Sequence, residues 1–132
     1  MFIHNSDRRL TNPNTFQRKG QVIAFDHGDA FAFLLPIIGG SDPVKSPLLD
    51  EVVRNHVFAG SFGPRSGVSL TRLRDAIADL DDDFFEAVQR ATPSAWTDRL
   101  ATGMLERACS VLRQRRDAVD LWLPQVQTWI LK

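Results

Sequence analysis

The sequence has little cysteine, no tyrosine and no excess of charge of either sign. Cys109 is the only cysteine in 132 residues, which excludes an internal disulfide and suits a reducing compartment. Sixteen basic residues balance sixteen acidic ones, so no overall field favours nucleic acid or an anionic membrane. The aromatic residues are nine phenylalanines and three tryptophans, a set typical of packing rather than of polar surface recognition.

Long apolar runs are also missing. The longest one, residues 30–38, contains Pro36 and is too short to span a membrane. The N-terminal stretch MFIHNSDRRL is polar within four residues and lacks the apolar core of a signal peptide. We therefore predict a cytoplasmic protein without a membrane span or a nucleic-acid partner. A chain of 132 residues, 43% of them hydrophobic, is long enough for one globular domain, residues 1–132.

Two parts of this domain differ in the secondary structure that their residues favour, and they meet near GGSDPVKSP at residues 39–47. Residues 1–40 are rich in turn signals, and residues 21–25 predict a short strand entered through Gly20. Phe16 begins the partner strand, and RKG forms the turn of the resulting hairpin. Residues 46–132 carry helical signals, so we predict an α+β fold that is mostly α.

Four helices are expected in the second part. The first begins at Ser46-Pro47 and has an apolar face that extends to Val57, and the second begins at Ser69 or Thr71. The third is capped by Asp81 and stops at Thr92-Pro93, and the fourth runs from about residue 97 to about residue 123, where Pro124 interrupts it. The predicted inward residues of the second and third helices are Leu70, Leu73, Ile77, Leu80, Phe84, Phe85 and Val88. The hairpin is expected to pack on this helical bundle.

Polar residues of defined spacing flank the predicted hairpin. Asp7 is followed five residues later by Asn12, and after the hairpin come Asp26 and Gly28. In kinase-type phosphoryl transfer, an Asp orients the attacking hydroxyl and an Asn five residues later ligates magnesium. An Asp-x-Gly turn then supplies a second magnesium ligand. Magnesium prefers oxygen ligands and keeps several waters, so two side chains from neighbouring loops are enough to hold it.

The segment HNSDRRLTNPNTFQRKGQVIAFDHGDAF, residues 4–31, resembles the catalytic segment of HipA-like kinases, relatives of the phosphatidylinositol 3- and 4-kinases. NHVF at residues 55–58 and ATPSAW at residues 91–96 are also similar, although less diagnostic. The resemblance implies a kinase-like C-terminal lobe that transfers phosphate from Mg²⁺-ATP to a hydroxyl. It implies Asp7 as the catalytic aspartate and Asn12 and Asp26 as magnesium ligands. Further cofactor-binding candidates are Arg8, Asn14, His27 and Gly28.

A kinase also needs a glycine-rich loop and a strand lysine in an N-terminal lobe, and only six residues precede Asp7. We therefore expect that lobe to be absent and a partner chain or a second copy of this chain to supply what is missing. The alternative is a catalytically inactive, helical interaction or regulatory module derived from such a kinase. A small metal-dependent hydrolase using the same acidic loops is a third reading.

Several residues also have ordinary structural interpretations. Arg8 is as easily a surface arginine as a phosphate ligand, and His27 suits a turn hydrogen-bonded to its own loop. A transition-metal site of His4, His27 and nearby aspartates matches no familiar ligand spacing. Four other features predict packing or solvation: His56 and Cys109 as packed residues, Asp81–Asp83 as charge at a helix N-terminus, RQRRD at residues 113–117 as a solvated face, and Trp122 with Trp129 as cover for apolar surface.

Overall fold

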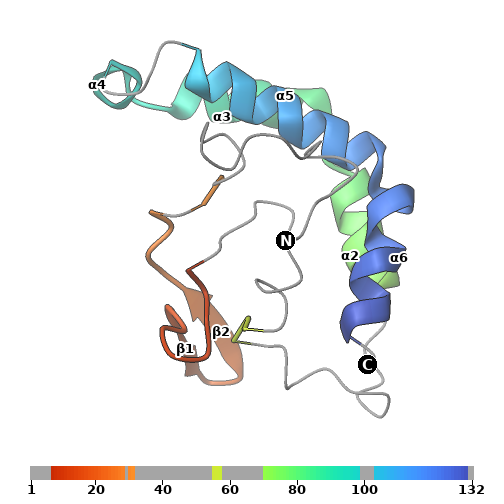
Figure 1. Cartoon of the computed structure of the whole chain (residues 1–132). Coiled ribbons are helices and arrows are strands. Elements are labelled where there is room, and N and C mark those ends of the chain that lie inside the picture. Colours follow the sequence, from red (N-terminus) through yellow and green to blue (C-terminus); the bar gives the residue numbers. More distant parts are fainter. Residues whose placement is uncertain (1–6, 29, 32–54, 58–69, 99–102, 131–132) are drawn as a thin grey trace.

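The computed structural model describes residues 7–28, 30–31, 55–57, 70–98 and 103–130. Within these ranges the chain forms one two-stranded antiparallel hairpin and five helices (Figure 1). The prediction of a mostly helical protein with a short hairpin is confirmed. The predicted helix at residues 46–54 lies outside the described residues.

The hairpin follows the sequence prediction within one residue. Strand β1 (Thr15–Arg18) pairs with β2 (Gln21–Ala24), so that Thr15 lies opposite Ala24 and Arg18 opposite Gln21. The two turn residues, Lys19 and Gly20, have φ angles of 50° and 78°. Positive φ at both central residues is the property of a type I′ turn, whose twist matches that of the strands it joins.

Residues 55–57 are not helical, contrary to the prediction that the apolar face of the first helix extends to Val57. The N–H of Leu10 donates to the carbonyl of Asn55 at 2.9 Å, and the N–H of Val57 donates to the carbonyl of Arg8 at 3.0 Å. His56 thereby forms an isolated bridge with Arg9. In a helix, the carbonyl of Asn55 and the N–H of Val57 would bond to other residues of the same helix. Here they bond to Leu10 and Arg8, in the loop after Asp7.

The helices are α2 (Thr71–Ala78), α3 (Asp82–Ala91), the single turn α4 (Ser94–Thr97), α5 (Met104–Asp117) and α6 (Val119–Ile130). Helix α3 begins and ends as predicted. Asp81 caps it by accepting a hydrogen bond from the N–H of Phe84 at 2.8 Å, and it ends at Thr92, before Pro93. In the described part of the chain, no helix is both long and apolar enough to cross a membrane.

The predicted final helix is divided at Ala118 rather than at Pro124. Helix α5 ends there, and α6 then continues through Pro124 to Ile130. The indole N–H of Trp122 donates to the carbonyl of Arg115 at 2.8 Å, which satisfies a carbonyl at the end of α5. A proline inside a helix costs about 3 kcal/mol, and burial of the residues beside it offsets that cost.

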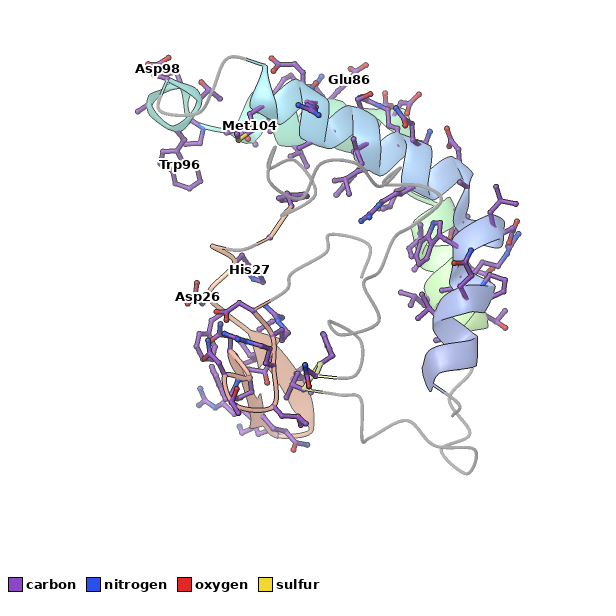
Figure 2. All side chains as sticks on the ribbon, in the orientation of Figure 1. Asp26, His27, Glu86, Trp96, Asp98 and Met104 are labelled. Atoms are coloured by element: carbon purple, nitrogen blue, oxygen red, sulfur yellow. The ribbon has the colours of Figure 1, made fainter. Side chains whose placement is uncertain are left out.

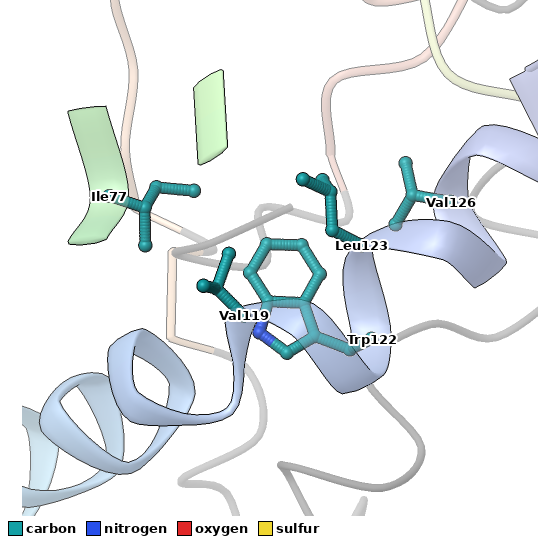
Figure 3. Packing of buried hydrophobic residues seen from close by; sticks show 5 residues of the cluster. All are labelled: Ile77, Val119, Trp122, Leu123 and Val126. Carbon is teal, nitrogen blue, oxygen red and sulfur yellow. The ribbon is translucent and has the colours of Figure 1, made fainter. Parts of the chain in front are cut away.

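The core lies mainly between α2 and α6. Ile77 of α2 packs with Val119, Trp122, Leu123 and Val126 of α6, each no more than 6% exposed (Figure 3). A second group of buried side chains belongs to α3 and α5 and comprises Phe85, Ala108 and Cys109. The two helix pairs, α2 with α6 and α3 with α5, follow one another along an arc (Figure 1). The described elements make their extensive contacts between the two strands of the hairpin and between helices, and not between the hairpin and the helices.

Three predicted core residues are largely exposed: Leu73 and Phe84 at 46% and Val88 at 39%. Each helix here packs on few neighbours, so only part of its apolar stripe is covered.

The arginines of residues 113–117 are not the solvated face that the sequence predicted. Arg115 is 1% exposed, and burial lowers its pKa to about 10. Arg113 and Arg116 lie over the ring of Phe85, at 5.1 and 5.5 Å from its centroid, and both donate to Asp82. Their guanidinium groups therefore lie over the Phe85 ring while they also pair with the carboxylate of Asp82, at the N-terminus of α3.

Candidate functional site

Asp7, Asn12 and Asn14 lie together in one loop. The Nδ2 atoms of Asn12 and Asn14 donate to Oδ2 of Asp7 at 2.8 and 3.1 Å. Arg9 forms an ion pair with Oδ1 of the same carboxylate at 2.8 Å. These three donors fix the carboxylate of Asp7. Its side chain is 21% exposed and therefore keeps some access to solvent.

These contacts determine the chemistry open to Asp7. Hydrogen bonds from Arg9 and then Asn12 lower its pKa below 3.8, with smaller contributions from the charge of Arg9 and from Asn14. An ionised carboxylate of lowered pKa is a weak base. It can accept a hydrogen bond from a hydroxyl and orient it, which suits positioning better than full proton removal.

Arg9 was not singled out from the sequence. Its charge reaches Asp7 only because the chain turns back between the two residues, where the N–H of Arg9 donates to the carbonyl of Asp7 at 3.0 Å. The available signal was an arginine two residues from an aspartate inside a turn-rich segment, which is too common to identify a site.

Asn14 connects this loop to the hairpin. It is 6% exposed, and its φ of 45° turns the chain as it enters β1. Asparagine is one of the few residues besides glycine that adopt this left-handed conformation readily. The carbonyl of Asn14 also accepts from the N–H of Phe25 at 3.0 Å, which extends the strand pairing by one position.

Asp26 turns the chain as it leaves β2. It has a φ of 51°, and its Oδ1 accepts from the N–H of Gly28 at 3.3 Å. This is an Asx turn, a structure that aspartate forms readily. Within this Asp-x-Gly turn the left-handed residue is Asp26 and not the glycine. A Cβ at position 28 would lie 3.4 Å from Oδ1 of Asp26, an ordinary contact.

Arg8 bridges the loop and the turn. Its Nη2 lies 3.4 Å from the carbonyl oxygen of Phe25 and 3.2 Å from Nδ1 of His27. His27 and Asp26 project to opposite sides of the chain (Figure 2). All seven residues predicted for the site thus belong to two neighbouring segments, 7–14 and 25–28, at the open end of one hairpin.

The donor atoms suit magnesium better than a transition metal. Asn12 and Asp26 offer amide and carboxylate oxygens, the ligands that Mg²⁺ prefers. Among the described residues, no group of three or more His, Cys, Asp or Glu side chains could hold a metal ion. The described residues therefore do not assemble a transition-metal site of three such side chains. A magnesium site needs no group of this kind, because two oxygen ligands from the protein can be completed by water.

His56 lies beside this network through its bridge to Arg9. Burial is the main cause that lowers the pKa of His56 to about 4, and the charge of Arg8 adds to the effect. The histidine is therefore neutral near pH 7, in agreement with its prediction as a packed residue.

Comparisons with known proteins give no relative for this arrangement: the chain matches no family model, no curated protein and no solved structure.

Proposed function

We propose that this chain forms the C-terminal lobe of a HipA-like, phosphatidylinositol-kinase-related phosphotransferase that acts with Mg²⁺ and ATP. The observation that carries the proposal is the connection between the two segments. Asn14 and Arg8 tie the loop of Asp7 to the turn of Asp26. Asp7 and Asn12 are hydrogen-bonded to each other, and the turn that carries Asp26 is tied to their loop through Phe25 and His27, the two chain neighbours of Asp26.

Each residue has a role in this proposal. Asp7 orients the hydroxyl of the phosphate acceptor, and Asn14 and Arg9 hold its carboxylate in place. The amide oxygen of Asn12 and the carboxylate of Asp26 hold Mg²⁺, since Nδ2 of Asn12 is committed to Asp7. Bound magnesium would neutralise charge on the phosphates of ATP.

Recognition of ATP is proposed to involve a partner as well. A glycine-rich loop and a strand lysine normally cover the phosphates of a kinase-bound nucleotide. We propose that a partner chain with these features completes the site. The resemblance to HipA-like kinases supports a hydroxyl acceptor but does not distinguish a protein from a lipid or a small molecule.

Isothermal titration calorimetry with ATP, with and without Mg²⁺, tests the proposal. We expect heat that depends on Mg²⁺ for the wild type, a loss of the Mg²⁺ dependence in Asp26→Ala, and retained binding in Asp7→Ala. The control is Asp79→Ala, which removes a carboxylate at the exposed end of α2. No Mg²⁺-dependent heat from the wild type, alone or with a partner chain supplied, would contradict the function.

A second candidate function is that of an inactive interaction module. Phe16, Ile23 and Phe25 lie on one face of the hairpin by strand alternation, and they are 50%, 38% and 47% exposed. The rings of Phe16 and Phe25 have centroids 6.1 Å apart. Such a face favours association, here with a second copy of the chain.

Sedimentation velocity distinguishes the two functions. For the interaction module we expect a concentration-dependent dimer that Phe16→Ser abolishes and that Asp7→Ala and Asp26→Ala leave unchanged. A wild type that stays monomeric at all concentrations would exclude self-association.

A further inference from the structure

We propose that Arg8 is a positioning residue that couples the Asp7 loop to the Asp26 turn by contacting the residues on both sides of Asp26. The functional consequence rests on the proposed function above. The coupling itself is a property of the fold and is testable without nucleotide.

The contacts of Arg8 give the first argument. Its side chain leaves the segment that holds Asp7 and Asn12 and reaches the segment on the other side of the hairpin opening. There Nη2 lies 3.4 Å from the carbonyl of Phe25 and 3.2 Å from Nδ1 of His27. These two acceptors flank Asp26 in the sequence, so one guanidinium holds the turn on both sides of the proposed magnesium ligand.

The chemistry of the guanidinium gives these contacts their direction. A guanidinium has only N–H donors, so Arg8 can bond to the turn only by donating to acceptor atoms. The carbonyl oxygen of Phe25 is such an acceptor, and Nδ1 of His27 lies within hydrogen-bond distance of the same nitrogen.

The anchoring of Arg8 gives the second argument. Its own carbonyl accepts from the N–H of Val57 at 3.0 Å, which fixes the backbone from which the side chain extends. Its Nε is buried and has no hydrogen-bond partner. A buried donor without an acceptor is unfavourable, and such groups persist where the surrounding contacts determine the side-chain position. The guanidinium is thus held where its terminal nitrogen meets Phe25 and His27.

The backbone bond from the N–H of Phe25 to the carbonyl of Asn14 also joins the two segments, but it stops one residue before Asp26. The bonds that His27 and Gly28 make with their backbone atoms are local: Gly28 donates to Asp26, and His27 accepts from Ala30. Arg8 therefore extends the connection past Asp26, to the residues that determine the direction of its side chain.

Nuclear magnetic resonance tests the coupling directly. In Arg8→Gln we expect amide exchange at Gly28 to be about tenfold faster than in the wild type, as for loss of a charge-assisted hydrogen bond. The matched control, Arg18→Gln, makes the same change of charge on an exposed residue of β1 and should leave this exchange rate unchanged.

A second variant keeps the test decisive if Arg8→Gln destabilises the fold. His27→Phe leaves the arginine in place and removes only the acceptor, so it should raise exchange at Gly28 by a similar factor. Unchanged exchange at Gly28 in a folded variant would overturn the coupling.

Titration with Mg²⁺ and ATP connects the coupling to function. We expect Arg8→Gln and His27→Phe to weaken Mg²⁺-dependent ATP binding by about tenfold while their melting temperatures stay near that of Arg18→Gln. If the wild type binds and both variants bind equally well, the positioning role is wrong. If the wild type does not bind, the proposed function fails, and the resonance experiment still decides the coupling.

Discussion

The indole N–H of Trp122 donates to the main-chain carbonyl of Arg115 at 2.8 Å, across the break between α5 and α6. The same indole ring lies 2% exposed in the cluster between α2 and α6 (Figure 3). One side chain therefore both satisfies the end of one helix and packs the next helix against its neighbour.

Substitution of Trp122 should separate these two contributions. Trp122→Phe keeps most of the ring and loses the hydrogen bond, for an expected cost of about 1 kcal/mol plus a small packing loss. Trp122→Ala should cost about 3–5 kcal/mol. The control Leu121→Ala, at a residue 71% exposed, should change stability by less than about 0.5 kcal/mol in urea unfolding. Equal stability of wild type and Trp122→Phe would show that the hydrogen bond contributes nothing.

The cap of α3 should be worth a measurable amount. Asp81→Ala removes the acceptor for the N–H of Phe84 and is expected to cost about 1 kcal/mol. Asp81→Ser keeps a capping oxygen without the charge and should recover most of that loss in thermal unfolding followed by circular dichroism. A serine variant as unstable as the alanine variant would assign the effect to charge rather than to capping.

The ion pair between α2 and α6 should contribute little. Arg74 donates to both carboxylate oxygens of Asp120, at 2.7 and 3.0 Å, but the two side chains are 44% and 68% exposed. A double-mutant cycle with Arg74→Gln and Asp120→Asn is expected to give a coupling of about 0.2–1 kcal/mol that decreases at high salt. A larger coupling, insensitive to salt, would mean that the pair is shielded from solvent.

His56 should make stability fall in a defined pH range. Its pKa is 6.5 in the ordinary case and about 4 in the fold, so the unfolded chain binds a proton more readily. Stability is therefore expected to decrease as the pH falls from about 6.5 to about 4 and to lose no more from this group below that. His56→Gln should remove this part of the decrease in urea unfolding at several pH values. Parallel curves for the two proteins would contradict the prediction.

Local features were predictable from the sequence. The Lys19-Gly20 turn and the Asp81 cap are decided by residues within a few positions of one another, and both were found within one residue. The grouping of Asp7, Asn12 and Asn14 was predictable for the same reason, since all three lie in one short loop.

Features that depend on distant partners were not predictable. Arg115 is buried although RQRRD is mostly charged, and its carbonyl accepts from the indole of Trp122 across the break between α5 and α6. Residues 55–57 bond to residues 8 and 10 instead of continuing a helix, a pairing over more than forty positions. Periodicity describes which residues can share a face, but not whether another segment comes to cover that face.

The length of the Lys19-Gly20 turn has a consequence at the opposite end of the hairpin. With two residues in the turn, each strand position has a fixed opposite number, and Asn14 falls opposite Phe25. An extra residue there would slide one strand past the other and reverse the sides to which its side chains point. The turn that carries Asp26 would then lose its register with the loop of Asp7, whereas the contact of Asn14 with Asp7 lies within one loop and would remain. The length of the Lys19-Gly20 turn thus determines how the segment of Asp26 lies against the segment of Asp7.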